Sequence, residues 1–363
     1  MRTTTRLALP LLSATALAAS TPPQAGLAWG PEAGASVTKT FEVDASYDLE
    51  DLSLVVAGQD VGEFIGTPEM TFSTLTKVVL ADEYSAVGEG RPTKLVRTFE
   101  ELENTFTMSV VVMEESSDEE GESASELEGA TVVFTWDPET SEYRVAYPEE
   151  TAGDVALLED LVEDTDLRGL LPTEAVEEGA TWTFEARALE ALLMPSGDLR
   201  WMPEGMDAAD VEELQVLMEG LLEGFEDLLD ELLVGERTAT FAGTREVDGV
   251  RCAVVDLAVT IDSAVDLSGL LQELVEKAVS MQEEVPEDFS FSIDTADIAL
   301  AVTAEGELLW DVAAGLPHSL TMTGDVNVSF ELVASATGDS ENVDVDLAAD
   351  LAGTMDAKVG YAR

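Results

Sequence analysis

One stretch of the chain carries a wide apolar stripe at helical spacing. Between Met206 and Val234 the apolar residues recur at steps of three and four, which gathers their side chains on one face of an α-helix. Acidic residues fill most of the other positions. Asp207 is a suitable N-cap, and Gly235 stands where a left-handed C-cap residue is expected. The pattern predicts an amphipathic helix whose apolar face needs another surface to cover it.

This apolar stripe has two interpretations. In the first, the helix packs on the concave face of a β-sheet. In the second, it covers a cavity for an apolar ligand, because leucine-rich helices are also found over lipid cavities. Residue spacing does not separate the two. The candidate ligand-binding residues on this face are Leu214, Leu217, Leu221, Phe225, Leu228 and Leu232.

Most of the remaining chain alternates apolar and polar residues, the pattern of a half-buried β-strand. Residues 94–113 show it near their end, and residues 343–361 are also strand-like, with Asp344, Asp346 and Asp350 on an outward polar face. Asp248-Gly249 lies between two such runs and predicts a tight hairpin. Long neighbouring strands with short connections indicate antiparallel pairing.

Two further segments interrupt the β pattern. Residues 266–282 have helical spacing, begin at Asp266 or Ser268, and are followed by Pro286, which stops a helix. Residues 114–128 are almost entirely acidic or small, and their composition predicts a solvated hairpin loop.

These elements predict an α+β fold: a curved, largely antiparallel, half-barrel-like β-sheet with amphipathic helices packed on its concave face. The expected organisation has four parts. They are a removable signal peptide (1–28), an N-terminal β-rich half (29–150), a helical connecting region (151–235) and a C-terminal β-rich half (236–363) that contains the helix 266–282.

The first residues predict export. Arg2 and Arg6 precede an apolar run from Leu7 to Ala19, which is too short to span a bilayer and fits a secretory signal. We expect an exported, periplasmic or extracellular protein without a membrane span.

Acidic residues dominate the charge. The chain has 76 Asp and Glu against 17 Lys and Arg, a formal net charge of −59. Such a charge repels nucleic acid phosphates, so no nucleic-acid partner is expected. A solvated surface suited to salty water is one interpretation, because salt screens the self-repulsion. Diffuse calcium binding is the other.

The sequence offers little for catalysis. Its one histidine, His318, lies in a turn that leads into a strand, and no serine-nucleophile motif accompanies it. The single Cys252 sits among valines and is expected to be a small buried apolar residue. We therefore expect no catalytic residues, no metal ligands and no cofactor.

Three short motifs carry a resemblance. They are Leu171-Pro172 with Val176, Gly179 and Trp182, the Asp248-Gly249 hairpin before Cys252, and Trp310-Asp311 followed by Gly315 and Pro317. Together they resemble a class of uncharacterised exported bacterial β-rich proteins, which implies no particular activity. The order of elements is also similar in outline to the periplasmic lipoprotein carriers, which implies a curved sheet that holds acyl chains.

The leading hypothesis is an exported, non-enzymatic protein that binds an apolar or lipid-like ligand between sheet and helices. The alternative is a structural or interaction protein of the cell envelope, with a protein partner and no small ligand. A hydrolase using His318 is the second alternative.

Overall fold

The computed structural model describes residues 27–62, 68–113, 115–149, 151–203, 231–281, 290–338 and 341–363. The strands are β1 (Ser36–Val56), β2 (Gln59–Asp60), β3 (Glu69–Gly88), β4 (Arg91–Val112), β5 (Glu115–Ala124), β6 (Thr131–Asp137), β7 (Glu142–Ala146), β8 (Thr181–Thr183), β9 (Met202–Pro203), β10 (Gly235–Val247), β11 (Val250–Asp266), β12 (Ser290–Asp311), β13 (Leu316–Gly338) and β14 (Glu341–Ala362). The helices are α2 (Arg187–Leu193) and α4 (Ser268–Met281), with 3-10 turns η1 (Val155–Leu158) and η2 (Arg168–Leu170).

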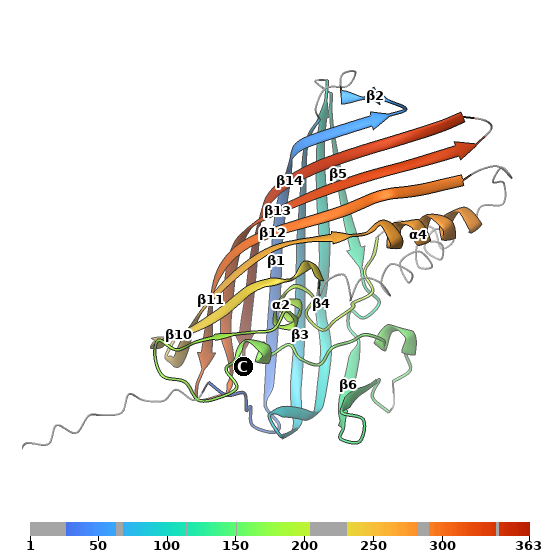
Figure 1. Cartoon of the computed structure of the whole chain (residues 1–363). Coiled ribbons are helices and arrows are strands. Elements are labelled where there is room, and N and C mark those ends of the chain that lie inside the picture. Colours follow the sequence, from blue (N-terminus) through green and yellow to red (C-terminus); the bar gives the residue numbers. More distant parts are fainter. Residues whose placement is uncertain are drawn as a thin grey trace, which may run out of the picture.

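The strands form a single sheet in the order β7-β6-β4-β3-β1-β14-β13-β12-β11-β10-β8 (Figure 1). All neighbours on this path pair antiparallel, as the sequence predicts. β5 adds to the upper part of β4, and β9 pairs with β5. β1 pairs with β14 from Thr38 with Ala362 to Val56 with Val345, which joins the two β-rich stretches of the sequence into one sheet.

Tight turns connect many of the long strands. Asp248 and Gly249 both have positive φ, 51° and 80°, and Val247 pairs directly with Val250. A two-residue turn with positive φ at both positions follows the right-handed twist of the strands. The hairpin predicted from Asp248-Gly249 is therefore confirmed.

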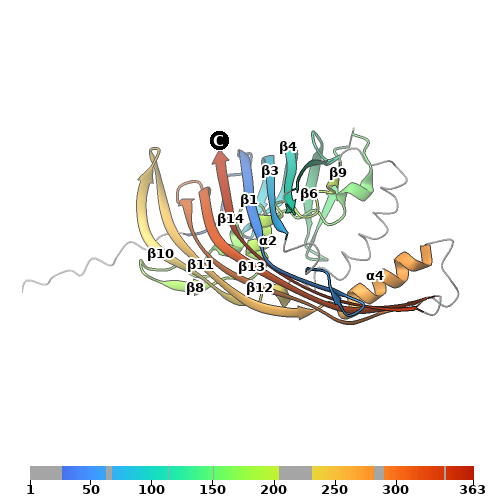
Figure 2. The same cartoon turned by 90° about the horizontal axis from the view of Figure 1, so that it is seen from above.

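The sheet is strongly curved, and its lower half encloses a hydrophobic core (Figure 2). The lower half holds the strand ends near Ser36, Arg91, Val250 and Leu316; the upper half holds the opposite ends. Residues 155–199, called the covering segment, lie against the inner face of the lower half, apart from β8, which pairs with β10. The segment buries Leu158, Leu161, Leu167, Leu170, Leu189, Leu192 and Leu199 in this core, whereas Val155, Val162 and Met194 stay exposed. Fully buried strand side chains in this core include Phe41, Leu80, Phe99, Phe241, Trp310 and Leu320.

The predicted α+β class, with amphipathic helices on the concave face of the sheet, is wrong. The described residues are mostly strand, the sheet is open, and the two helices are short. α4 lies along the edge of β12, beyond the point where β11 ends. Ser268 Oγ accepts from the Ala296 N–H at 2.8 Å, and Gln272 Oε1 accepts from the Ile293 N–H at 3.0 Å. The helix thus continues the edge of the sheet instead of covering its face.

The acidic segment 114–128 also differs from the prediction of a solvated loop. Most of it is strand β5, which pairs with β4 from Asn104 opposite Ser123 to Val112 opposite Glu115. Backbone pairing orders this segment while nearly all of its side chains stay exposed. Gly121 permits a close approach, since a Cβ there would lie 2.3 Å from a ring carbon of Phe106.

Gly235 does not act as a helix C-cap. It is the first residue of β10 and is not among the residues with positive φ. A Cβ at this position would lie 2.2 Å from the carbonyl oxygen of Thr260, so glycine allows β10 and β11 to approach closely. Helix 268–281 agrees with the predicted helix 266–282, and Asp266 accepts a hydrogen bond from the Ser268 N–H at 2.8 Å.

Candidate functional site

A continuous apolar surface covers the inner face of the upper half of the sheet. Three adjacent cross-strand rows run over β1, β14, β13 and β12, and all twelve residues in them are apolar. The first row is Leu49, Leu351, Val328 and Leu300; the second is Leu52, Ala349, Phe330 and Ile298; the third is Leu54, Leu347, Leu332 and Ala296. We call these twelve residues the upper inner surface.

Alternation along the strands fixes the direction of these side chains. In β14, Leu347 and Leu351 lie on the same face as Ala357 and Val359, which are buried in the lower core. Eleven of the twelve side chains of the upper inner surface are half-buried, and Ala296 is fully buried. Directly opposite residues touch across neighbouring strands, so the surface is contiguous.

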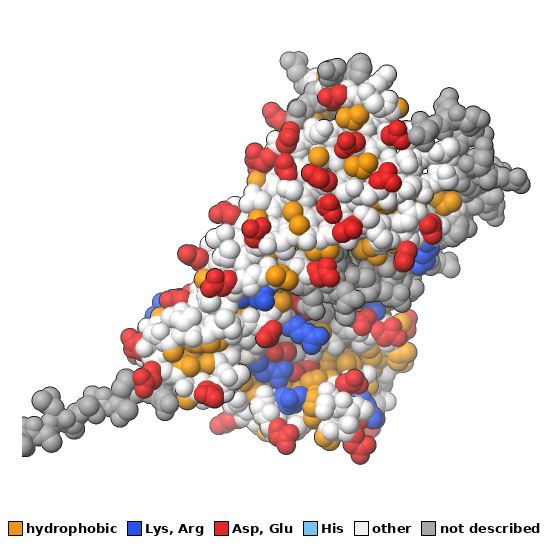
Figure 3. Space-filling view, in the orientation of Figure 1, with side chains coloured by type: hydrophobic (Ala, Val, Ile, Leu, Met, Phe, Trp, Pro, Cys, Tyr) orange, Lys and Arg blue, Asp and Glu red, His pale blue; other side chains and the backbone are white. Residues whose placement is uncertain are grey.

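The outer face of the same strands is acidic, and Figure 3 shows Asp and Glu side chains spread over it. Several acidic residues face each other directly across neighbouring strands. These pairs are Asp44 with Asp356, Asp51 with Asp350, Asp256 with Glu307, and Asp297 with Glu331. Like charges in directly opposite positions destabilise a sheet. The strands are therefore apolar on one side and strongly negative on the other.

A buried charge cluster lies at the inner face of the lower half. Lys39 on β1 contacts the carboxylates of Asp82 on β3 and Asp166 in the covering segment, each at 2.6 Å. Arg97 on β4 donates to both oxygens of Asp82, from Nε at 2.8 Å and from Nη2 at 2.9 Å. All four residues are at most 1% exposed. Two cations thus face two carboxylates in the protein interior.

The same cluster fixes the covering segment to the sheet. Arg97 Nη1 donates to the Val162 carbonyl at 2.9 Å, and Nη2 donates to the Glu163 carbonyl at 2.8 Å. Thr165 Oγ1 accepts from both Lys39 and Arg97 at 2.7 Å. Because the donors come from strands and the acceptors from the covering segment, these bonds hold the segment in place.

The carboxylate of Asp166 has three partners. Besides Lys39, it accepts from Tyr84 Oη at 2.6 Å and from Trp29 Nε1 at 2.8 Å. Burial, then the nearby carboxylates of Asp166 and Asp82, raise the pKa of Tyr84 well above its usual value, so this hydroxyl stays a donor. The charged groups of this cluster bond to one another, to Tyr84 and Trp29, and to the covering segment. This is the arrangement of a structural clamp.

Two carboxyls here shift in opposite directions. Burial alone would raise the pKa of Asp82, but the charges and hydrogen bonds of Arg97 and Lys39 outweigh it and hold that pKa well below its usual range. Burial raises the pKa of Glu163 to about 7 against the attraction of Arg168, and Asp164 and Asp166 add to the rise. Glu163 Oε1 is buried without a hydrogen-bond partner.

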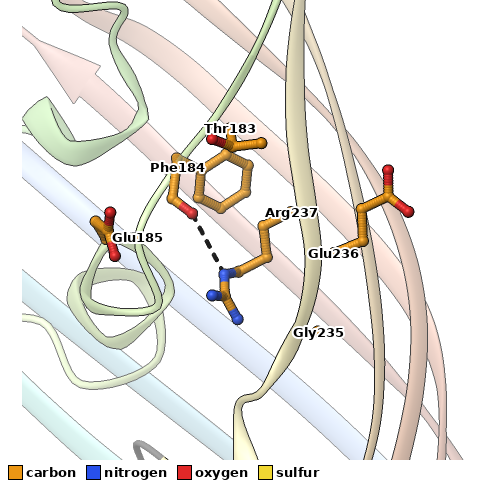
Figure 4. A pocket seen from close by; sticks show the side chains of 6 residues that line it. All are labelled: Thr183, Phe184, Glu185, Gly235, Glu236 and Arg237. Atoms are coloured by element: carbon orange, nitrogen blue, oxygen red, sulfur yellow. Dashed lines mark hydrogen bonds between the residues drawn. The ribbon is translucent and has the colours of Figure 1, made fainter.

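Two open pockets lie beside the covering segment. One, of about 460 Å³, is bordered by Phe184, Glu185 and Arg237 (Figure 4). The Arg237 guanidinium donates to the carbonyls of Phe184 and Leu233, so it ties loop to strand and does not point freely into the pocket. The other pocket, of about 560 Å³, is lined partly by Tyr143, Tyr147 and Leu161.

The predicted ligand-binding face falls mostly outside the described residues. Leu214, Leu217, Leu221, Phe225 and Leu228 all lie within 204–230, and their assignment to a ligand site stays a prediction. Leu232 is described and is 8% exposed. Its carbonyl accepts from Ser263 Oγ on β11 at 2.6 Å, which places it beside the sheet.

His318 and Cys252 occupy the lower half. His318 Nε2 lies 4.0 Å from Asp248 Oδ2, and the histidine borders neither of the two pockets described above. Cys252 is fully buried on the outer face beside Val254 and Leu309, as predicted from its neighbours. Burial raises the pKa of the Cys252 thiol.

Sequence reasoning missed both the upper inner surface and the charge cluster as sites. The first has a signal in the sequence, because period-two alternation continues through the whole of β13 and β14. The second has none: Lys39 and Thr165 are 126 positions apart, and only the fold brings them together.

The comparisons with known proteins give the following. No family model matches the chain, and no curated protein matches it. Among solved structures, the chain is similar to an outer membrane channel from Pseudomonas putida F1, with 8% identity, a TM-score of 0.16, and coverage of 92% of this chain and 98% of that one. It is also similar to OccK5 of Pseudomonas aeruginosa, with 7% identity, a TM-score of 0.18, and coverage of 87% and 98%.

Scores of this size do not establish a shared fold, so the function proposed below rests on the residues of this chain. The resemblance to lipoprotein carriers finds no support in these comparisons. Among the described residues, no helix has the length and apolar character needed to cross a membrane. In the same part of the chain, no group of three or more His, Cys, Asp or Glu is placed to hold a metal ion.

Proposed function

We propose that this chain is an exported, non-enzymatic protein that binds a long apolar molecule on the upper inner surface. One observation carries the proposal: three adjacent rows across four strands are entirely apolar, and eleven of their twelve side chains remain half-exposed. A contiguous apolar surface that stays partly exposed is a candidate place for another molecule to bind. The N-terminal sequence supports export.

The shape of the surface favours an elongated ligand. Each strand rises about 3.3 Å per residue, so the run from Leu49 to Leu54 extends roughly 17 Å along the strand direction. Covering apolar surface is worth about 25 cal/mol per Å². A chain-like molecule lying along the strands would cover several rows at once and gain more than a compact one.

The chemistry of the charged groups supports a binding role over a catalytic one. The buried cations and carboxylates are engaged with one another and with the covering segment, away from the upper inner surface. The rows themselves contain no nucleophile, acid or base. A ligand there would meet methyl, methylene and aromatic groups only.

A matched pair of substitutions on β13 tests the proposal. Leu332 belongs to the upper inner surface, whereas its neighbour Val333 faces outward and is 36% exposed. Leu332→Asp is expected to weaken binding of an uncharged environment-sensitive dye by at least about tenfold. Val333→Asp adds the same charge on the opposite face and should bind like the unchanged protein.

Dye fluorescence titration measures the affinity, and native mass spectrometry of protein from its own host tests for a retained apolar molecule. Equal binding by the two variants would contradict the assignment to the inner face. An unchanged protein that binds neither dye nor any extractable apolar mass would contradict the function itself and favour an interaction with another protein.

A further inference from the structure

The upper inner surface lacks any positive charge that could hold an anionic headgroup. Among the described residues, no Lys or Arg occupies an inward position in the upper parts of β1, β12, β13 or β14. The nearest inward cation is Arg237 on β10, which lies two strands away from β12 and donates to the carbonyls of Phe184 and Leu233. The inward cations Lys39 and Arg97 lie further off in the lower half, where they are buried and bound to Asp82. A carboxylate or phosphate bound on this surface would therefore be desolvated without a partner.

The other cations near these strands are engaged as well. On the outer face Lys77 pairs with Glu101 and Lys358 pairs with Glu42. Lys277 of α4 also interacts with the protein. These contacts leave the negative charges of the outer face in large excess, in keeping with the net charge of −59.

The carboxylates of the outer face would also repel an anion that is bound on the inner face. These carboxylates stand on the same strands as the upper inner surface, separated from it only by the backbone layer. Through a thin apolar layer, charge–charge interactions are less weakened than in bulk water. An anion on the inner face would feel this field, and added salt would reduce it.

An uncharged polar group borders the surface at its lower edge. Tyr47 on β1 lies on the inner face one row below Leu49, opposite Phe72 on β3 and Gly353 on β14, and is half-buried. A phenol hydroxyl can donate and accept a hydrogen bond. It offers a partner to a hydroxyl, ester or amide group and carries no charge that would pair with an ion.

We infer that the ligand is an uncharged long-chain amphiphile, such as an alcohol, ester or glyceride, and that fatty-acid anions and acidic phospholipids are disfavoured. The inference rests on the proposed function and specifies its substrate class. It follows from the absence of an inward cation, from the negative outer face, and from the uncharged polar border.

Two ligands with the same hydrocarbon chain test it: 1-oleoylglycerol and oleate, each competing with the uncharged dye at pH 9 and low salt. The glyceride is expected to bind at least about tenfold more tightly, and 1 M NaCl should narrow the gap. Oleate binding as tightly as the glyceride would overturn the inference while leaving the proposed function intact. Binding of neither ligand would count against the proposed function.

A second pair of variants separates local from long-range charge. Val328→Lys places a cation on the upper inner surface, and Ser329→Lys places it on the outer face of the same strand. Val328→Lys should raise oleate affinity relative to the glyceride by about tenfold, and Ser329→Lys by much less. An equal gain in both variants would contradict the local argument. Thermal unfolding of each variant confirms that it is folded.

Discussion

The two halves of the sheet are built from the same long strands but differ in how far their inward side chains are buried. In the lower half, the inward residues Val37 and Phe41 of β1 are at most 2% exposed, because the covering segment packs on them. In the upper half, the inward residues Leu49 and Leu54 of the same strand stay half-exposed. Alternation is similar in both halves. Among the described residues, the difference is that the covering segment lies on the inner face of the lower half and not on that of the upper half.

The halves also differ in how they carry charge. The lower half places Lys39, Asp82, Arg97 and Asp166 in its interior, where they pair with one another. In the upper half, the upper inner surface is uncharged, and the outer face of the same strands carries acidic residues, including the directly opposed pairs Asp51 with Asp350 and Asp297 with Glu331. The stability of the lower half should therefore depend on single ion-pair partners and on pH. The stability of the upper half should depend on salt concentration.

The largest effect is expected from Asp82→Ala. This change leaves Lys39 and Arg97 buried without their shared carboxylate, and breaking a buried ion pair from one side costs about 3–5 kcal/mol. Urea denaturation followed by circular dichroism measures the loss in free energy of unfolding. The control is Glu42→Ala, which breaks the exposed pair with Lys358 and should change little. Similar losses in both variants would contradict the distinction between the buried charge cluster and an exposed ion pair.

Truncating one leucine on each inner face compares how deeply the two faces are buried. Leu80 is fully buried in the lower core, so Leu80→Ala should cost about 2–5 kcal/mol. Leu347 belongs to the upper inner surface and is half-exposed, so Leu347→Ala should cost about 1 kcal/mol. The same denaturation measurement applies to both. A loss for Leu347→Ala as large as that for Leu80→Ala would show that the upper inner surface is covered in solution.

Glu163 gives the lower half a dependence on pH. Its pKa of about 7 lies above its ordinary value of 4.5, so the folded protein holds this proton more tightly than the unfolded chain does. Its contribution to stability is complete below pH 4.5 and is lost as pH rises through 7. Its charged or titratable neighbours include Arg168, Asp164 and Asp166 in the covering segment and Tyr143 on β7.

Glu163→Gln should remove this contribution. The variant is expected to gain stability relative to the unchanged protein between pH 5 and pH 8, and urea denaturation at both values measures the difference. A relative stability that is the same at both values would contradict the assignment. Asp82 acts in the opposite sense: its depressed pKa adds stability that is lost only as the solution becomes strongly acidic.

The smallest effect concerns the outer face of the upper half. Asp51 and Asp350 face each other across β1 and β14, so Asp350→Asn should stabilise the protein by about 0.2–1 kcal/mol at low salt. The gain should shrink in 1 M NaCl, because the Debye length is then about 3 Å. Thermal unfolding at two salt concentrations measures it. A gain that is independent of salt would point to a cause other than charge repulsion.

Local patterns in the sequence were enough for some elements. Alternation predicts the long antiparallel strands, Asp248-Gly249 predicts the β10–β11 turn, and helical spacing followed by Pro286 predicts α4. Each of these signals lies within a few residues of the structure it specifies. The outward position of Asp344, Asp346 and Asp350 on β14 follows from the same alternation.

Other features depend on distant partners. β5 forms because β4 offers it a free edge, although its own acidic composition predicts a loop. The covering segment has weak patterns of its own and is positioned by Arg97 and Lys39 on distant strands. The prediction of helices on the concave face failed because spacing shows that a helix is amphipathic but not which surface it meets.

The central pairing of β1 with β14 has a consequence for how the chain folds. β14 is synthesised after the other thirteen described strands, yet it forms the partner that β1 needs on one edge, with Glu42 and Lys358 separated by 316 positions. Contacts between such distant residues slow folding, because a long loop must close before they form. Until β14 arrives, β1 and β13 both present open edges that can pair with other chains. The nascent protein is therefore most prone to aggregation before β14 has been synthesised, and a chaperone that shields strand edges would act at that stage.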